Sequence, residues 1–165
     1  MSACMSETSF RHRFVADAPL GRLAKHLRLA GFDTLLDTQA PRPDRLASLA
    51  HDRRTILTRS GKVHRALTGI PLILVRANDP RDQFRQVTAT LGLGPGELRP
   101  LTRCALCNRE LDRLSKPDAL GRVPEYIWQQ HGDFKTCPEC RRIYWPGSHG
   151  QRWRDQIVDW FSATK

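Results

Sequence analysis

The chain has 165 residues, of which 39% are hydrophobic and 27% charged, and this composition excludes a disordered tail. No apolar run reaches the ~20 residues that a membrane-spanning helix needs, so no membrane partner is expected. Residues 1–10 are polar and lack the apolar centre of a secretory signal, so we expect a cytoplasmic protein.

The charge is strongly basic. The sequence holds 27 Lys and Arg against 17 Asp and Glu, a net charge of +10. Residues 1–99 carry 16 of these basic residues and 9 of the acidic ones, so the excess is densest there. Such a surface attracts polyanions and favours a nucleic acid as partner, although a plain basic protein would have the same charge.

Short apolar segments alternate with helical patterns in the first part of the chain. Strands are expected at 14–16, 34–36, 55–58 and 72–75, and helices at 20–30, 44–50, 61–67 and 80–91. Gly31 and Gly92 supply helix stops, Asp44 stands where an N-cap belongs, and Asp79 precedes a first-turn Pro80.

This alternation predicts an α/β fold, a mainly parallel sheet with helices on both faces. Such a sheet presents its chemistry at the carboxyl ends of its strands. The turn-rich stretch at 92–100 predicts a boundary between an α/β domain over 11–95 and a second module over 101–165.

Four of the five cysteines form two CxxC pairs, Cys104 with Cys107 and Cys137 with Cys140, while Cys4 stands alone. Two such pairs can complete a tetrahedral four-thiolate site, the geometry that structural Zn²⁺ favours. The redox alternative is weaker, because a thioredoxin-like site uses one CxxC after a strand. The sequence thus predicts a structural zinc ribbon.

Several residues of the second module carry two interpretations. Lys135, Arg141, Arg142 and the pair Tyr144 and Trp145 are candidates for substrate contact, or the two aromatic residues form the small core of the ribbon. A stripe of Trp153, Ile157, Trp160 and Phe161 predicts a terminal helix packed against the body of the protein, with a partner groove or a base-stacking platform as the alternative. His51, His131 and His149 are candidates for general acid–base catalysis or for an extra metal ligand, but we expect them to be ordinary surface or loop histidines.

Carboxylates follow the expected strands. Asp17 comes directly after the first strand, Asp37 after the second and Asp79 after the fourth, and Asp44 opens a helix from the same edge. Oxygen ligands grouped in this way suit Mg²⁺ or Mn²⁺, which can activate water beside a phosphodiester. Helix capping explains Asp17, Asp44 and Asp79 equally well.

Six segments together resemble the Mut-seven C-terminal ribonuclease domain family: FVADAPLGRLAKHLRLAGFDTLL (14–36), TILTRS (55–60), PLILVRANDPRDQFRQV (71–87), RCALCNREL (103–111), GRVPEYIW (121–128) and CPECRRIYWPGSH (137–149). The last is the most specific of them. The resemblance implies a PIN-like nuclease fold with a zinc ribbon, and hence a metal-dependent RNase.

In the PIN-like pattern an acidic residue closes the first strand and another begins the helix after the second, and Asp17 and Asp44 match these positions. A third acidic residue usually follows the third strand, but this chain has Ser60 there. With a hydroxyl in place of a carboxylate, metal affinity is expected to fall, and Asp37 or Asp79 are candidates to substitute.

The leading hypothesis is therefore an endoribonuclease-like protein. Asp17 and Asp44 would bind the dication, with Ser60 as a weak ligand or a water-holder. Basic residues would contact the phosphate backbone of RNA, namely Arg22, Lys25, Arg59 and Lys62. The alternative is an RNA-binding module with little or no catalysis, docking on RNA or on a ribonucleoprotein, and a third option is a DNA-binding zinc-ribbon factor.

Overall fold

The computed structural model describes residues 12–147 and 155–161. The first part of the chain forms a four-stranded sheet from β1 (Arg13–Ala16), β2 (Asp33–Leu36), β3 (Thr55–Thr58) and β4 (Leu72–Leu74). The strand order is β2-β1-β3-β4, and every pair is parallel. The predicted parallel α/β sheet is thus confirmed, with strand ends within one residue of those expected.

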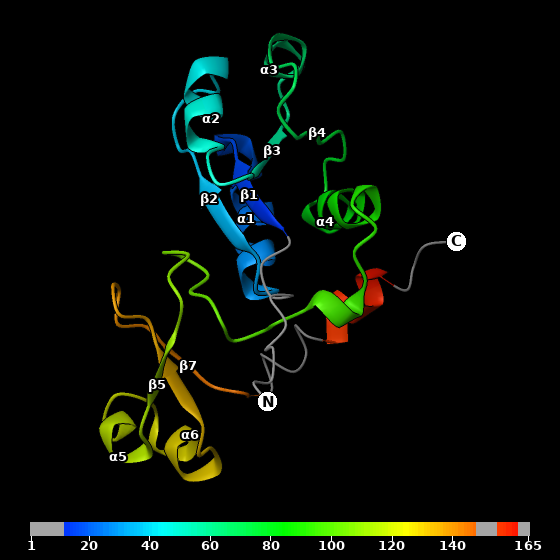
Figure 1. Cartoon of the computed structure of the whole chain (residues 1–165). Coiled ribbons are helices and arrows are strands. Elements are labelled where there is room, and N and C mark those ends of the chain that lie inside the picture. The colour runs from blue at the N-terminus through cyan, green and yellow to red at the C-terminus, as the bar shows by residue number, and fades with distance from the viewer. Residues whose placement is uncertain (1–11, 148–154, 162–165) are drawn as a thin grey trace, which may run out of the picture.

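Helices cover both faces of this sheet (Figure 1). A short turn, η1 (Ala18–Leu20), leads into α1 (Gly21–Leu29), and the other helices are α2 (Pro43–Leu49), α3 (Gly61–Ala66) and α4 (Pro80–Thr90). Side chains alternate along the strands, so Phe14 and Ala16 lie in one core cluster with α1 and α4 residues. Val15 lies in the other, with Leu46 of α2 and Val63 of α3.

Of the three aspartates expected as possible helix caps, Asp79 is confirmed, whereas Asp17 makes no side-chain cap hydrogen bond and the N-cap residue of α1 is Leu20. Asp79 caps α4 by accepting a hydrogen bond from the Arg81 N–H at 2.8 Å. The prediction that Asp44 is the N-cap of α2 is wrong, because the helix begins at Pro43 and Arg42 is its N-cap residue. Proline is favoured in the first turn, because it has no N–H to leave unsatisfied there, and this moves the helix start ahead of Asp44.

The second module is a small antiparallel sheet beyond the short turn η2 (Pro95–Glu97). Its strands are β5 (Asp112–Leu114), β6 (Phe134–Thr136) and β7 (Ile143–Tyr144), and the β5–β6 connection holds α5 (Lys116–Ala119) and α6 (Glu125–Gln130). Its core is a cluster around Phe134 and Ile127, against which Trp145 packs. The interpretation of Trp145 as part of a small ribbon core is therefore supported.

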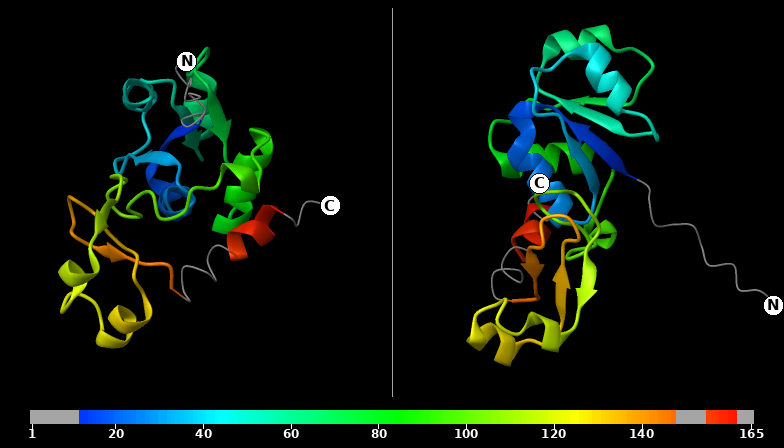
Figure 2. Two further views of the ribbon diagram at one scale, coloured as in Figure 1. Left: turned by 60° about the horizontal axis from the view of Figure 1, so that its bottom comes forward. Right: turned by 90° about the vertical axis from the view of Figure 1, so that its left-hand side faces the viewer.

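The helical segment at 155–161 returns to the α/β body, where it lies near α4 (Figure 2). Ile157 is fully buried and Trp160 is 5% exposed, and both lie in the core cluster that contains Phe84 of α4. This confirms that the stripe packs against the body, although Trp153 lies outside the described residues, as do Cys4 and His149. Among the described helices, none is long and apolar enough to span a membrane.

The two sheets meet at the amino ends of the parallel strands. Asn108, in the second module, contacts Asp33 and Thr34 at the start of β2, and Arg28 in the last turn of α1 contacts the same module. The carboxyl ends of the strands point the other way, toward α2 and α3 (Figure 1). The four-cysteine module therefore does not border the edge that carries Asp17.

Candidate functional site

Three polar side chains stand in a row where β2, β1 and β3 end. Ala16 pairs with Leu36 on one side and Leu57 on the other, so the next residues, Asp37, Asp17 and Thr58, lie side by side on one face. With the order β2-β1-β3-β4, connections leave β1 and β3 in opposite directions, and ligands bind at such a switch point. We call this row the acidic rim.

Asp17 is held firmly at the centre of the rim. It is fully buried, and its Oδ2 accepts hydrogen bonds from the Thr58 hydroxyl at 2.5 Å and the Arg59 backbone N–H at 3.0 Å. Its Oδ1 is buried without a hydrogen-bond partner. Burial raises the pKa of Asp17, against the lowering effect of these hydrogen bonds and of the Arg59 charge, and the nearby Asp37 charge raises it further.

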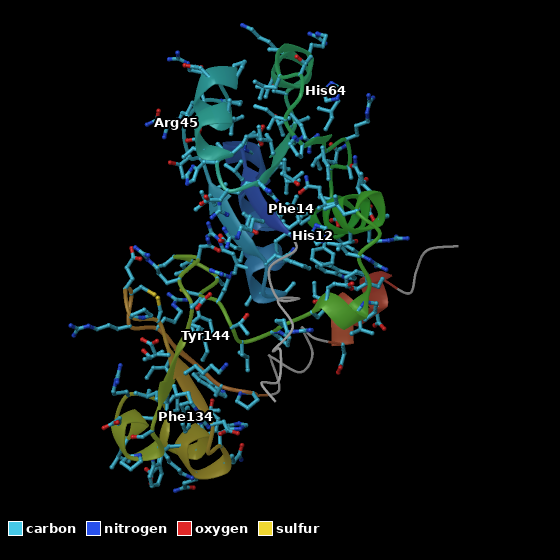
Figure 3. The ribbon with its side chains drawn as sticks, in the orientation of Figure 1. His12, Phe14, Arg45, His64, Phe134 and Tyr144 are labelled. Carbon is cyan, nitrogen blue, oxygen red and sulfur yellow. The ribbon has the colours of Figure 1, made fainter. Side chains whose placement is uncertain are left out.

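Asp37 is the second buried carboxylate of the rim. Both of its oxygens accept from the Arg45 Nε at 2.8 Å, and the Gln39 N–H donates to Oδ1 at 3.2 Å. The Arg45 side chain comes from α2 and is labelled in Figure 3. Arg45 thus offsets one of two negative charges that would otherwise repel each other in a buried place.

Asp44 lies on the exposed first turn of α2. Its carboxylate forms a two-point ion pair with Arg42, at 2.8 and 3.2 Å, and its side chain is 67% exposed. What little burial it has would raise its pKa, but the hydrogen bond and charge of Arg42 hold the pKa below the ordinary value. Asp44 is therefore paired with Arg42 and is not part of the buried row of Asp37, Asp17 and Thr58.

Ser60 follows Thr58 by two residues and is the N-cap of α3. Its Oγ accepts a hydrogen bond from the Val63 N–H at 3.3 Å, and its own N–H donates to the Thr58 hydroxyl at 3.0 Å. The Thr58 hydroxyl therefore accepts from Ser60 and donates to Asp17. Ser60 reaches the buried carboxylate only through this relay.

The basic residues predicted to contact substrate occupy two sides of the rim. Arg59 follows β3, and its guanidinium donates to the Ala77 carbonyl at 3.0 Å and the Asn78 side chain at 2.7 Å. Lys62 is exposed on α3. Arg22 and Lys25 are exposed on α1, which covers the opposite face of the sheet from α2 and α3.

One observation indicates that the acidic rim is suited to bind a hard dication. A buried carboxylate oxygen without a partner loses the hydration it had in water, and such groups are rare unless a ligand or proton satisfies them. Asp17 Oδ1 is in this position, with the Asp37 carboxylate near enough to raise its pKa. Oxygen donors of this kind suit Mg²⁺ or Mn²⁺.

The four cysteines of the second module converge as the spacing predicted. The sulfur atoms of Cys104, Cys107, Cys137 and Cys140 all lie within 4.8 Å of one another, and the Cys104 and Cys140 sulfurs are 3.6 Å apart. A tetrahedral Zn²⁺ with Zn–S bonds of about 2.3 Å places its sulfurs about 3.8 Å apart. The cysteines are therefore positioned to bind a metal ion.

Each CxxC pair forms the same tight turn. Asn108 and Arg141, the residues after the two pairs, have positive φ angles of 62° and 58°. Their N–H groups donate to the carbonyls of Cys104 and Cys137 at 3.0 and 2.9 Å. The Cys107 N–H also donates to the Cys104 sulfur at 3.4 Å. These turns aim both thiols of a pair at one point.

Tyr144 supports the cysteine site from β7. Its hydroxyl accepts from the Ala105 N–H at 3.2 Å and lies 3.1 Å from the Cys104 sulfur, to which it can donate (Figure 3). Burial opposes ionisation of Cys104, but the hydrogen bonds from Tyr144 and the backbone lower the pKa of Cys104 to about 6. Outer hydrogen bonds of this kind orient metal ligands.

Sequence reasoning missed three residues of these sites: Thr58, Arg28 and Asn108. Thr58 could have been found by aligning the strand ends, since it occupies on β3 the position that Asp17 occupies on β1. Arg28 and Asn108 join segments 77 and 74 residues apart, and local pattern carries no signal for such pairs. Lys135, a candidate for substrate contact, donates to the Leu101 carbonyl at 2.6 Å, and its contact with substrate stays a prediction.

These features define a class of protein. Its members have a doubly wound α/β domain with buried carboxylates at the switch point, joined to a four-cysteine metal module. The model of the Mut7-C RNAse domain family matches residues 12–157, which is most of the chain. The chain therefore belongs to the Mut7-C RNAse domain family. No curated protein and no solved structure matches it.

Proposed function

We propose that the protein is a metal-dependent ribonuclease that hydrolyses RNA phosphodiester bonds at the acidic rim. The observation that carries the proposal is the buried, unpartnered Oδ1 of Asp17 beside a second carboxylate, in a chain of an RNase domain family. Two carboxylates buried side by side repel each other, and a bound cation would reduce that repulsion.

In this proposal Asp17 offers Oδ1 to Mg²⁺ or Mn²⁺, while Thr58 and the Arg59 N–H hold Oδ2 and fix the rotation of the carboxylate. Asp37 adds negative charge from β2. Asp44 joins from α2, because its exposed ion pair with Arg42 is weak and a dication can compete for it. A bound dication lowers the pKa of water and offsets charge on the phosphodiester.

The hydroxyl of Ser60 is used as a helix cap, so we assign it a positioning role through Thr58. Arg59 and Lys62 lie on the β3–α3 side and Arg22 and Lys25 on the α1 side, so the phosphate backbone is proposed to pass between them. The four-cysteine site is proposed to hold Zn²⁺ as a structural ion, since four thiolates leave no open position for water.

Cleavage of a single-stranded RNA with Mn²⁺ tests this function, with wild type compared against Asp17→Asn and against the control Asp112→Asn, an exposed change on β5. We expect Asp17→Asn to lose at least about a hundredfold in rate, while the control keeps the wild-type rate. Mn²⁺ should also raise the melting temperature of wild type and not of Asp17→Asn. Equal cleavage by wild type and Asp17→Asn would refute the site.

The second candidate function is RNA binding without cleavage, and the capping role of Ser60 favours it. A helix cap stands where the family pattern has a third carboxylate, so metal affinity is lower than with three. This candidate predicts RNA binding that weakens steeply with salt, survives Asp17→Asn and yields no cleaved product. The division at 11–95 and 101–165, the cytoplasmic location and a ribonucleoprotein partner stay predictions.

A further inference from the structure

The four-cysteine module is fastened to the α/β body by a small set of polar contacts. Among the described residues, hydrogen bonds join the first cysteine turn, at 104–108, to the junction between α1 and β2. Strand β2 is at the edge of its sheet, so one side of its backbone has no neighbouring strand. An edge of this kind needs partners for its N–H and C=O groups.

Arg28 is the centre of this junction. Its side chain leaves the last turn of α1 and is 8% exposed. The Nε donates to the Thr34 carbonyl at 2.8 Å, and Nη1 donates to the carbonyls of Ala105 and Leu106 at 3.2 and 2.7 Å. One guanidinium thus binds the edge strand and the two residues between Cys104 and Cys107.

Asn108 makes the return contact from the cysteine turn. Its side-chain oxygen accepts from the Thr34 N–H at 2.9 Å, and its side-chain nitrogen donates to Asp33 at 2.8 Å. Asn108 also has the positive φ of the turn, a conformation that asparagine adopts more readily than most residues. Both backbone groups of Thr34, its N–H and its C=O, are therefore satisfied by this junction.

The charge of the junction matches what a filled site requires. Zn²⁺ with four thiolates carries a net charge of −2, and the cost of burying that charge is reduced by a nearby cation. The thiols of Cys104 and Cys107 are close enough to Arg28 to raise its pKa when ionised, although burial holds the pKa of Arg28 below its ordinary value overall. Arg109, two residues after Cys107, is exposed, and its pKa is raised chiefly by its pair with Glu139 and further by ionised thiols of the cysteine site, but its guanidinium donates to Glu139 and not to the described turn at 104–108.

We infer that Arg28 is the counter-charge of the metal–thiolate centre and couples metal occupancy to the docking of the four-cysteine module on β2. A filled site fixes the turn whose carbonyls receive the guanidinium. An empty site leaves four thiols and a flexible turn, so the carbonyls of Ala105 and Leu106 and the side chain of Asn108 lose their set positions. Metal loading therefore controls the contact between two parts of the chain.

Amide hydrogen exchange on the full chain tests the coupling. The Thr34 N–H depends on Asn108, whereas the Val75 N–H donates to Thr58 at 2.8 Å on the other side of the sheet. Removing zinc with a chelator should lower protection of Thr34 at least tenfold and leave Val75 unchanged. Unchanged protection of Thr34, or an equal loss at both amides, would overturn the proposal.

Zinc affinity tests the counter-charge. Competition with a chromophoric chelator should give a 10- to 100-fold weaker zinc affinity for Arg28→Gln, partial recovery for Arg28→Lys, and less than a threefold change for the control Arg122→Gln, an exposed arginine of the same module. The cobalt-substituted Arg28→Gln protein should keep the absorption of four thiolate ligands. Wild-type affinity in Arg28→Gln, or loss of a thiolate ligand, would overturn it. If Arg28→Gln does not fold, the exchange experiment on wild type still decides.

Discussion

The Thr58 hydroxyl donates a 2.5 Å hydrogen bond to Oδ2 of Asp17, and this contact fixes which carboxylate oxygen is left free. Thr58 and Asp17 end neighbouring strands that are far apart in sequence, and their register brings them together. The bound oxygen also accepts the Arg59 N–H, so the other oxygen is the one without a partner. This asymmetry makes Asp17 a ready ligand and an unfavourable place for an unneutralised charge.

The first prediction concerns the pH dependence of Asp17. Because burial raises its pKa in the folded state, the folded protein binds the Asp17 proton more tightly than the unfolded chain, whose value is near 3.8. This contribution to stability is complete below 3.8 and is lost as the pH rises through the folded-state pKa. Wild type should therefore gain free energy of unfolding relative to Asp17→Asn as the pH falls.

Urea denaturation of both proteins at matched pH, without added Mg²⁺ or Mn²⁺, measures this difference. Comparing the two proteins at the same pH cancels every pH-dependent contribution to the free energy of unfolding that they share, including that of the cysteine site. The control Asp112→Asn, whose side chain is exposed, should show no such trend. A difference between wild type and Asp17→Asn that is flat with pH would contradict a raised pKa.

The second prediction concerns the ion pair of Asp33 and Arg54. Arg54 donates to both oxygens of Asp33 at 2.8 and 2.9 Å. The side chain of Arg54 is 8% exposed and that of Asp33 is 14% exposed. Replacing one member of a buried pair leaves the other charge uncompensated, so Asp33→Asn should lower the free energy of unfolding by about 3 kcal/mol. The pair of Asp82, whose side chain is 57% exposed, and Arg85 provides the control, and Asp82→Asn should change the free energy of unfolding by less than about 0.5 kcal/mol.

The pH dependence of this pair has the opposite sign to that of Asp17. Burial alone would raise the pKa of Asp33, but hydrogen bonds from Arg54 and Asn108 and the charge of Arg54 lower it. The stabilisation is therefore complete above the ordinary value of 3.8 and is lost as the pH falls through the lower folded-state pKa. The advantage of wild type over Asp33→Asn should shrink only in this acidic range, and a loss near neutral pH would be inconsistent with it.

The third prediction concerns Gly31, at the turn from α1 to β2. Its φ is +99°, and a Cβ there would clash with the carbonyl oxygen of Arg99. The Arg99 N–H donates to the Ala30 carbonyl at 2.8 Å, which holds the two segments together. Gly31→Ala combines strain with a clash against backbone and should lower the free energy of unfolding by about 3 kcal/mol. Gly92, with a φ of +64° and open space around it, is the matched control.

Gly92→Ala should lower the free energy of unfolding by about 1 kcal/mol, because it meets only the strain of its φ angle. Both variants can be compared by their melting temperatures in one buffer. Equal effects of the two substitutions would mean that the close approach of Arg99 to Gly31 does not constrain the turn.

The sequence pattern predicts the sheet, the helices and the cysteine site because each depends on local spacing. Leu20, Leu23 and Leu27 recur at helical intervals, and each CxxC pair shapes its own turn. The partners of the carboxylates depend on register and could not be predicted in this way. Asp44 has the expected place in sequence but pairs with Arg42, while Asp37 lies beside Asp17 because β1 and β2 are neighbours.

The fourth prediction concerns Trp160, which fixes the helical segment at 155–161 to the body. Its ring meets Phe84 edge-on with centroids 5.5 Å apart, and His26 of α1 at 5.0 Å. Trp160→Ala removes a large buried ring and should lower the free energy of unfolding by about 3 to 5 kcal/mol. Trp160→Phe keeps most of the contact and should lower it by less than about 1.5 kcal/mol.

A second measurement on Trp160→Ala separates local packing from general loosening. Burial lowers the pKa of His26, and the positive charge of Lys25 lowers it further. Removing the ring that covers His26 should let water reach the imidazole, so its pKa should move up toward 6.5 in an NMR titration of the folded variant. Trp160→Phe should leave that pKa close to its wild-type value. If the pKa of His26 stays depressed in Trp160→Ala, its burial comes from other parts of the fold, and the segment at 155–161 is not what shields it.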